Sequence, residues 1–506
     1  LFGIAAGGTS AFYDFEINNS LRLEDGSNTY LSRTPSSTGN RKTWTFSAWI
    51  KRATLGTKQH LMFAGTASTN RGMIYLETDD TLRYYVRESG VNLGGGTGSS
   101  RVSITDAKLR DVSAWYHIVV AIDTTQSTNS NRTKIYINGS LQSLSQTQYP
   151  NQDTNTFFNS TAEHAIGHQG YDEISDFDGY MAEVNFIDGQ ALDPTSFGQT
   201  KSGVWIPKDT SGLTFGTNGF RLQFNDSGDI GNNANSTDGT NDYTPHNFST
   251  HDVMPDSPTN NFPVLSFIDS NTNLSEGNLK FAQGSGAGFK ANSTFVIEDI
   301  ADSQKYYVEY VSDSGYINGI IPADVTGANN NTTRTGHYGY YPNTGNKYDG
   351  SSASSYGATH GTSNQMAMLI GDGQIEFFKD NASQGVAFTG LTGSYKIMSN
   401  AFGATGAGVI YNFGADSSFA GAKTAQNNTD ANGLGDFFYY LHLAHLLCVP
   451  LIFQNHLSIL QKTIFQKIIS KQTFGQETAQ VKAYLVMNLH QIGFGLKKEI
   501  AHQATI

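Results

Sequence analysis

The chain has 506 residues, of which 15% are charged and 38% hydrophobic, proportions that are typical of folded protein. Its formal net charge is -12 and it contains no block of Lys or Arg, which argues against binding to nucleic acid or to an anionic membrane through a basic face. A single cysteine, Cys448, excludes a disulfide within the chain. Abundant Gly and aromatic residues, at 54 glycines and 12% Phe, Trp and Tyr, indicate short strands joined by many turns, so we expect an all-β fold.

Residues 1–19 are expected to lead into the first domain. They lack the basic start and apolar stretch of a signal peptide, so either the true N-terminus is missing or export uses another route. Residues 20–205 then show apolar residues at every second position between turn clusters, the pattern of a β-sandwich. In the run from Trp44 to Ile50, Trp44 and its alternate neighbours are predicted to line the core, with Trp49 on the opposite face.

A strand, loop, strand and tight turn follow between residues 115 and 140. The Asn138-Gly139 pair is the strongest two-residue signal for a hairpin turn. Trp115 lies at the start of this unit and Tyr136 in its second strand. Both side chains are large and aromatic, and we predict that they fill the core.

A third block, from Phe177 to Phe186, contains Asp178-Gly179 and precedes Ala191-Leu192-Asp193-Pro194. In this order and spacing, the three blocks resemble the laminin-G and concanavalin A-like lectin sandwich. The resemblance implies a jelly roll of two antiparallel sheets that recognises glycans or proteins through loops at one rim, sometimes with calcium. We expect His168 and Tyr171, in the loop before this block, to contact the ligand.

Aspartates near the turns of this domain are candidate calcium ligands, since Ca²⁺ prefers carboxylate and carbonyl oxygens. The candidates are Asp123, Asp172, Asp176 and Asp178. The alternative is that these side chains cap backbone amides, as acidic residues in turns usually do. A structural Ca²⁺ is therefore a possible cofactor, and the sequence points to no other.

Glycan hydrolases also use this type of sandwich, and they need two carboxylates about 5 to 10 Å apart across the scissile bond. The nearest array, from Asp172 to Asp178, has the wrong spacing and lies in a loop before the strand. We therefore expect no catalytic residues and a protein that is not an enzyme.

Residues 206–269 are predicted to form a turn-rich connector with one strand near Gly219–Phe224 and a loop at 225–241 that consists almost entirely of Asn, Asp, Gly and Ser. The Asp-rich loop is interpreted as a solvated linker, with calcium binding as the alternative. The segment Asp256–Phe262 resembles a connector that recurs in marine phage proteins with this lectin-like module.

A second strand series occupies residues 270–436. A Tyr-rich strand at 305–311 precedes a Gly-Asp-Gly turn that ends at Gly373, the pair Phe377-Phe378, and the closing triplet Asn412-Phe413-Gly414. This order resembles the SPRY sandwich, which implies a second, non-catalytic recognition module.

Between residues 320 and 362, tyrosines are interspersed with Gly and Asn, a composition shared with antibody binding loops. The predicted ligand contacts in this region are Tyr338, Tyr340, Tyr341 and Tyr348. The alternative is that they cover the edge of the sheet.

Residues 437–506 differ in composition from everything before them. Residues 441–506 contain no Asp and no Arg but five of the 13 His, and they include helix-compatible runs. Because His442, His445 and Pro450 interrupt the apolar stretch, insertion into a membrane is disfavoured. We predict a locally helical, atypical tail, and we hypothesise a reading-frame shift, because chosen back-translations of 450–457 and 492–499, read in another frame, resemble the continuation of the phage family.

These features favour two tandem antiparallel β-sandwiches in a non-catalytic surface protein of a virion, such as a tail fibre, located on the virion or outside the cell. Its expected partners are a host-surface glycan or protein, other virion proteins and further copies of itself. The alternatives are a secreted bacterial adhesin and a polysaccharide-degrading enzyme.

Overall fold

The computed structural model describes residues 12–88, 100–170, 175–236, 239–270, 274–282, 286–325, 336–350, 352–404, 406, 408–430 and 433–440. Tyr171, Asp172 and residues 441–506 lie outside this part of the chain, so the predictions made for them stay predictions. Within the described residues, the helical elements are short 3₁₀ turns: η1 (Asp25–Ser27), η2 (Asn129–Asn131), η3 (Pro194–Ser196) and η4 (Thr250–Asp252). The all-β prediction is confirmed.

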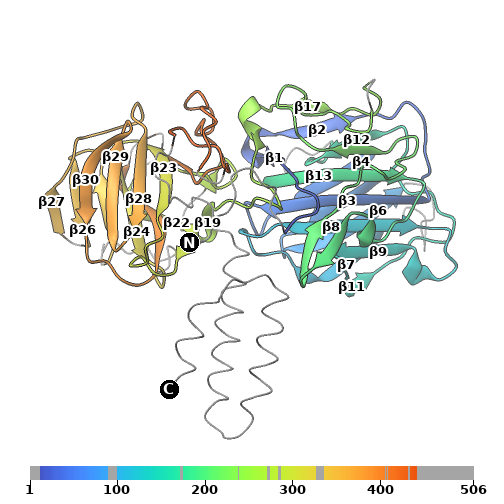
Figure 1. Ribbon diagram of the computed structural model, residues 1–506. Helices are drawn as coiled ribbons and strands as arrows, with labels where there is room; N and C mark the ends of the chain where they lie inside the picture. Colours follow the sequence, from blue (N-terminus) through green and yellow to red (C-terminus); the bar gives the residue numbers. More distant parts are fainter. Residues whose placement is uncertain are drawn as a thin grey trace, which may run out of the picture. The chain divides into compact units, whose positions relative to one another are not determined.

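The first sandwich consists of two eight-stranded sheets, here called A and B (Figure 1). Sheet A contains β10 (Ser140–Leu141), β9 (Thr133–Ile137), β8 (Tyr116–Asp123), β3 (Thr43–Arg52), β13 (Gly179–Asp188), β1 (Ser20–Leu23) and β18 (Val253–Met254) in this order, and β16 (Phe220–Leu222) also pairs with β13. Sheet B contains β11 (Leu144–Thr147), β7 (Ser100–Lys108), β6 (Thr81–Glu88), β5 (Asn70–Leu76), β4 (Gln59–Ala67), β12 (Glu163–Ile166), β2 (Tyr30–Arg33) and β17 (Thr244–His246). A separate hairpin is formed by β14 (Gly198–Lys201) and β15 (Val204–Pro207).

The core of this sandwich lies between sheets A and B, as the alternation in β3 predicted. Trp44 is fully buried there, and its indole N–H donates to Thr156 Oγ1 at 2.8 Å. Trp49 lies on the other face of sheet A, where it stacks on His117 with ring centroids 4.7 Å apart. Strand periodicity therefore assigned both tryptophans to the correct faces.

The predicted turn after β9 is present, because Asn138 and Gly139 have φ angles of 48° and 76°. A Cβ at Gly139 would lie 2.5 Å from the Trp205 ring, so the turn also requires glycine for close packing. Tyr136 differs from the prediction: it is half-buried and packs with Val119 and Phe197 on the outer face of sheet A. Its position in β9 points it away from the space between the sheets, which the alternation of β9 alone could not decide.

Residues 206–254 are not a solvated connector, because they complete the first sandwich. Strand β16 pairs with β13, β17 with β2, and β18 with β1. Ile230 and Tyr243, which flank the Asn/Asp-rich loop, belong to the core between sheets A and B. The predicted domain boundary at 205 is therefore too early, because edge strands that would otherwise be open are covered by chain from beyond it.

The segment Asp256–Phe262 is also packed rather than solvated. Asp256 is 1% exposed, and its carboxylate accepts from Lys51 Nζ at 2.8 Å and from the Trp115 indole N–H at 3.1 Å. Trp115 is buried as predicted, but against Tyr180 and Phe262 and not in the core between sheets A and B.

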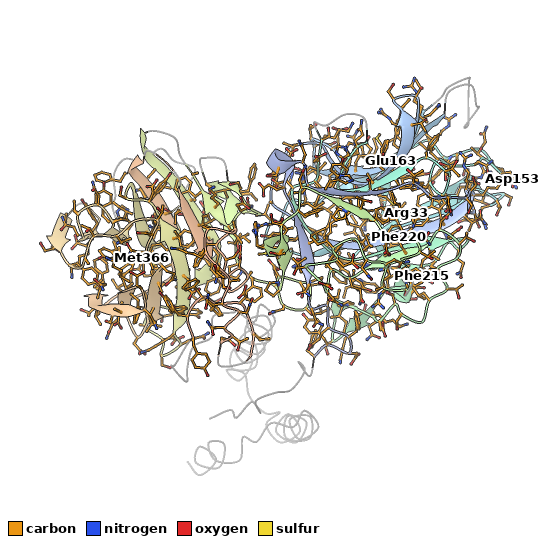
Figure 2. The ribbon with its side chains drawn as sticks, turned by 90° about the horizontal axis from the view of Figure 1, so that it is seen from above. Arg33, Asp153, Glu163, Phe215, Phe220 and Met366 are labelled. Carbon is orange, nitrogen blue, oxygen red and sulfur yellow. The ribbon has the colours of Figure 1, made fainter. Side chains whose placement is uncertain are left out.

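The second sandwich consists of two seven-stranded sheets, here called C and D. Sheet C contains β19 (Leu265–Ser270), β22 (Gly286–Ile297), β31 (Tyr395–Ala404), β24 (Tyr316–Pro322), β25 (Tyr338–Tyr341), β26 (Asn346–Asp349) and β27 (Ser352–Ser355). Sheet D contains β20 (Leu274–Ser275), β21 (Lys280–Phe281), β32 (Val409–Asn412), β23 (Tyr306–Ser312), β28 (Met366–Gly371), β29 (Gln374–Lys379) and β30 (Ala382–Phe388). Its core includes Met366, labelled in Figure 2.

The sequence features that suggested this second sandwich lie where strand pairing needs them. Gly373 has a φ of 69° in the turn between β28 and β29, and Phe377 is fully buried whereas its neighbour Phe378 is half-buried on the other face. The Asn412 side chain accepts from the backbone N–H groups of Gly414 and Asp416. Phe413 is buried at the end of β32.

The native fold continues past Asp436, where the tail was predicted to begin. Phe437 is fully buried against Tyr307 and Ala367, and the backbone N–H groups of Phe438 and Tyr439 donate to the Glu309 carboxylate at 2.8 and 3.0 Å. The predicted boundary is therefore too early by several residues. Of the helices in the described part of the chain, none has the length and apolarity required to cross a membrane.

Candidate ligand-binding rim of the first sandwich

The loop before β13 carries His168 and Asp176 to one rim of the first sandwich. Its ends are joined by a hydrogen bond from the Phe177 N–H to the Gly167 carbonyl at 2.8 Å. Inside this closure, a His168 ring nitrogen lies 2.6 Å from Asp176 Oδ1. The sequence placed both residues at this rim, and the structure brings them into direct contact.

Aromatic rings continue this contact across the edge of sheet B. Tyr30 in β2 stacks on His168 with centroids 4.1 Å apart and on His246 in β17 with centroids 4.2 Å apart. The two histidines cover both faces of the Tyr30 ring, so Tyr30 is half-buried between them; His168 is buried, and the half-buried His246 is the outer ring of the stack. Flat aromatic surface of this kind packs against the C–H faces of sugars or against apolar side chains.

Acidic residues gather beside this stack because β1 ends where β13 begins. Leu23 pairs with Gly179, so Glu24 and Asp25, which follow β1, lie close to Asp178, which precedes β13 (Figure 1). The Asp176 backbone N–H donates to the Asp25 carboxylate. We call Glu24, Asp25, Asp176 and Asp178 the acidic rim cluster.

Ionisation of the carboxyl groups in the acidic rim cluster is unfavourable, because their pKa values are raised. Burial raises the pKa of Asp178 to about 6, a hydrogen bond from Thr54 opposes this, and the charge of Asp25 adds to it. Burial, followed by the charge of Asp178, raises the pKa of Glu24 to about 8. Burial and the nearby Asp176 also raise the pKa of Asp25. These carboxyl groups favour either protonation or a neutralising cation.

Two carboxylate oxygens in the cluster lack a hydrogen-bond partner. Asp176 Oδ2 and Asp178 Oδ1 are both buried and unpaired, although Asp178 Oδ2 accepts from Thr54 Oγ1. Within the described residues, no three His, Cys, Asp or Glu side chains converge as a complete metal site. The aspartates could therefore supply only part of a calcium shell, with backbone carbonyls and water as the remaining ligands that Ca²⁺ accepts.

Asp123, which was predicted as a separate candidate calcium ligand, does not belong to this cluster. It pairs with Thr43 at the start of β3, whereas Gly179 pairs with Arg52 at the end of that ten-residue strand. The two ends are about 30 Å apart at 3.3 Å per residue. Burial tends to raise the pKa of Asp123, but hydrogen bonds from Thr125 and Gln126 outweigh it and lower the pKa, so Asp123 caps a turn.

The four tyrosines predicted to contact a ligand in the second sandwich lie in strands and not in loops. Tyr338, Tyr340 and Tyr341 lie in β25 and Tyr348 lies in β26. Tyr340 is fully buried, and its hydroxyl donates to the Ala358 carbonyl, while the Tyr341 hydroxyl donates to the Phe402 carbonyl at 3.2 Å. Only Tyr338 is partly exposed, and its ring packs on Phe388. The burial of Tyr340, Tyr341 and Tyr348 favours the alternative that they cover a sheet, whereas ligand contact by Tyr338 stays a prediction.

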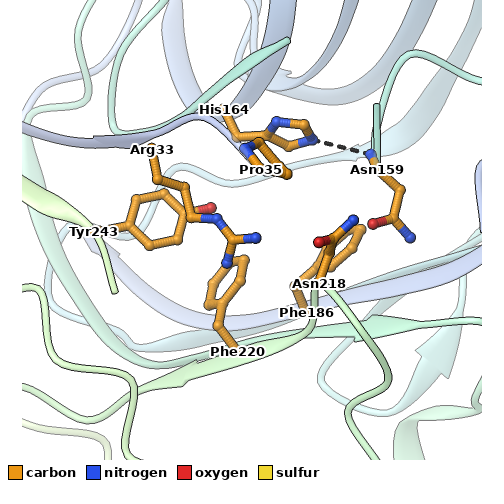
Figure 3. Close-up of a pocket in the computed structure, with 8 residues that line it drawn as sticks. All are labelled: Arg33, Pro35, Asn159, His164, Phe186, Asn218, Phe220 and Tyr243. Atoms are coloured by element: carbon orange, nitrogen blue, oxygen red, sulfur yellow. Dashed lines mark hydrogen bonds between the residues drawn. The ribbon is translucent and has the colours of Figure 1, made fainter. Parts of the chain in front are cut away.

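A small cavity inside the first sandwich is lined by Arg33, Phe220 and Tyr243, with His164 accepting from the Asn159 N–H at 3.0 Å (Figure 3). Figure 2 shows Arg33 and Phe220 close together, and the guanidinium carbon lies 5.9 Å from the Phe220 centroid. The cavity volume of about 10 Å³ accommodates one water molecule at most. It is a packing defect and not a ligand site.

Sequence reasoning missed Glu24 and Asp25. Their signal was present, since two acidic residues directly follow the apolar strand Ser20–Leu23. Their proximity to Asp178 depends on the pairing of β1 with β13, which are separated by more than 150 residues in the sequence. Such pairing cannot be read from a local pattern.

Comparison with known proteins agrees with this architecture for the first sandwich. Residues 25–196 match the family described as the concanavalin A-like lectin/glucanases superfamily (Laminin_G_3). No curated protein matches the chain.

Three solved structures with similar folds are distant from this chain in sequence. Domains LG4-5 of the mouse laminin α1 chain are 8% identical, with 81% of this chain and 89% of that chain covered and a TM-score of 0.29. The SPRY domain of human HERC1 is 15% identical, with 29% and 96% covered and a TM-score of 0.25. A pentraxin from Limulus polyphemus is 15% identical, with 35% and 79% covered and a TM-score of 0.26. At these scores the likenesses do not extend to function.

Proposed function

We propose that this protein is a non-catalytic binding protein that recognises a cell-surface glycan or protein through the rim of its first sandwich. The observation that carries the proposal is the acidic rim cluster with its unpaired, buried oxygens on Asp176 and Asp178 beside the half-buried rings of Tyr30 and His246. An unpaired buried acceptor is costly, and a bound ion is one way to satisfy it.

Calcium is the cofactor that best fits these residues. Asp176 and Asp178 would hold it, Asp25 would add negative potential, and Glu24, whose pKa is raised to about 8, would become charged only as the cation binds. A bound cation would neutralise the repulsion that raises the pKa values of Glu24 and Asp178. When bound, Ca²⁺ also supplies open coordination positions that accept sugar hydroxyls or carboxylates.

Hydrolysis of a polysaccharide fits this rim less well. Asp176 is 1% exposed and in contact with His168, and Asp178 is 9% exposed and in contact with Thr54. A glycosidase needs two carboxyl groups that flank the scissile bond, and the buried positions of Asp176 and Asp178 do not suit this arrangement. Incubation with host surface polysaccharide should therefore produce no new reducing ends.

The proposed biological setting is a virion appendage, such as a tail fibre, with several copies on one particle. Multiple weak rim contacts made together would give avidity without a deep pocket in any copy. The resemblance of residues 256–262 to a phage connector supports this setting. A secreted bacterial adhesin is the alternative, and the neighbouring genes distinguish the two.

The test is a glycan array with the full chain, in Ca²⁺ or in EDTA, alongside two variants. Asp178→Asn removes one cluster charge, while Asp153→Asn removes an exposed charge that pairs with Lys42 in a distant loop (Figure 2). We expect EDTA and Asp178→Asn to abolish the same subset of glycan signals, which Asp153→Asn retains. If neither treatment removes any signal, the acidic rim cluster is not a glycan-binding site.

A further inference from the structure

Strands β1 and β16 share one edge of β13 and leave a gap between them. β1 pairs with residues 179–181 of β13, and β16 pairs with residues 184–186, so neither strand pairs with Ala182 or Glu183. β3 occupies the opposite edge along the whole strand. The gap is therefore a feature of the first sandwich that is separate from the acidic rim cluster.

A bulge in β13 turns the Glu183 side chain toward this gap. The register with β3 shifts between Ala182 and Asn185, and Glu183 has a φ of 47°, which a residue with a long side chain rarely adopts. Bulges of this kind redirect side chains and are common beside binding sites.

A polar cleft of about 100 Å³ occupies the gap. Its walls are formed by residues just before β1 and just after β16 together with the bulge, and include Phe15, Glu16, Asn18, Glu183, Gln223 and Asn225. Asn18 and Asn225 are exposed at its mouth, and Glu183 is buried at its base. Its size suits the edge of one sugar ring and excludes a large apolar ligand.

The side chains at the base are held in place. Arg221 Nε donates to Glu183 Oε1 at 2.5 Å, and Thr210 Oγ1 donates to the same oxygen at 2.8 Å. Glu183 Oε2 has only a long contact, 3.4 Å, with Gln223 Nε2. A fixed carboxylate with one weakly used oxygen is ready to accept a hydroxyl hydrogen bond.

The charges in the cleft select the class of ligand. Glu16 and Glu183 repel anionic sugars, whereas the Arg221 guanidinium beside Glu183 disfavours a divalent cation. The Phe15 ring carries the Arg221 guanidinium 5.8 Å from its centroid, so recognition depends on the carboxylate and amide groups, which suit neighbouring hydroxyls. We propose that this cleft binds the terminal residue of a neutral glycan, at a site independent of the acidic rim cluster.

The probes for the test are D-glucose, D-galactose, D-mannose and N-acetyl-D-glucosamine, added to the full chain and followed by saturation-transfer NMR and titration calorimetry. Gln223→Ala removes a wall of the cleft, and Asn225→Trp fills its mouth. Asn155→Trp is the matched control, because Asn155 is also exposed but lies in another loop. The melting temperature of each variant verifies that it folds.

We expect at least one of these sugars to bind, with affinity lowered about tenfold or more by Gln223→Ala and by Asn225→Trp but not by Asn155→Trp, Asp178→Asn or EDTA. The proposal is overturned if none of the sugars binds or if the cleft variants bind them as well as the parent does. It is also overturned if the Asp178→Asn variant binds Ca²⁺ and adding Gln223→Ala abolishes that binding, because the cleft would then be a cation site. A sugar lost only with Asp178→Asn or EDTA would instead place its site at the rim, which separates failure of this proposal from failure of the proposed function.

Discussion

Asp178 lies in a turn that requires glycine at the next position, and this turn buries its carboxyl group. The next residue, Gly179, has a φ of 145°, and a Cβ there would collide with the Lys51 carbonyl, so the chain enters β13 through a turn that needs glycine. That turn holds the Asp178 carboxyl group in a buried position, with one oxygen bound by Thr54 and the other unpaired. The motif Asp178-Gly179 was recognisable in the sequence, but the burial of its carboxylate was not.

Stability should decrease with pH because of the acidic rim cluster. The pKa values of Asp178 and Glu24 are raised from 3.8 and 4.5 to about 6 and about 8, so folding takes up protons. The contribution of these two groups to the free energy of unfolding is complete below about pH 4. The Asp178 contribution, on the order of 3 kcal/mol, is lost as the pH rises through 6, and the Glu24 contribution is lost as it rises through 8. Urea unfolding from pH 3 to 9 in EDTA measures the change in the free energy of unfolding, and Asp178→Asn should reduce its slope between pH 4 and 6. A parent profile that is already flat there would contradict these raised pKa values.

Trp115 is expected to be important for stability through its position against the Asp256–Phe262 segment. Trp115→Ala should cost about 3 to 5 kcal/mol, as for other buried aromatic residues. Trp115→Phe keeps most of the packing but removes the N–H that donates to Asp256, at a cost of about 1 to 3 kcal/mol. Denaturant unfolding of both variants checks the order. Equal, small losses would place the indole in solvent.

At the scale of elements, the strands divide into those that a local pattern predicts and those that it does not. Alternation in β3 and the Asn138-Gly139 turn are local, and the structure contains both. The predicted strand near Gly219–Phe224 contains β16, but its pairing with β13 was not predicted, and the three-residue strand β17 was interpreted as linker because it pairs with β2, far away in the sequence. The Tyr/Gly-rich strands β25 and β26 were predicted as loop for the same reason, since Gly and Asn weaken the strand signal.

Lys51 joins β3 to the segment after β18. Its fully buried Nζ donates to Asp256 at 2.8 Å, to Asn261 at 2.8 Å and to the Phe262 carbonyl at 2.7 Å. Lys51→Met should cost about 3 to 5 kcal/mol, because it leaves the buried Asp256 carboxylate without its cation. The double variant Lys51→Met/Asp256→Asn should recover part of this loss in the same unfolding assay. Additive losses in the double variant would show that the two charges are not coupled.

At the scale of the whole described chain, Arg22 links residues from three regions. It is fully buried in β1, and its guanidinium lies 2.9 Å from Asp252, 3.1 Å from Glu276 and 3.6 Å from Asp416. Composition and motifs predicted two sandwiches, and this was correct. They could not predict that buried ion pairs would connect them, because a lone arginine next to Leu21 and Leu23 has no local pattern that identifies its partners.

The prediction that an atypical tail begins near residue 437 can be tested by two truncations. Removal of residues 441–506 should leave the unfolding of both sandwiches unchanged and improve solubility. Under the reading-frame hypothesis, the many Leu, Ile and Phe residues of this segment were not selected to pack.

Truncation after Asp436 should instead cost about 3 to 5 kcal/mol, because it removes the fully buried Phe437 and the two N–H groups that bind the Glu309 carboxylate. Urea unfolding of the two truncated proteins beside the full chain measures the difference. A loss of stability on removing residues 441–506 alone would show that the tail packs natively, and equal stability of the two truncated proteins would show that Phe437 contributes nothing to the fold.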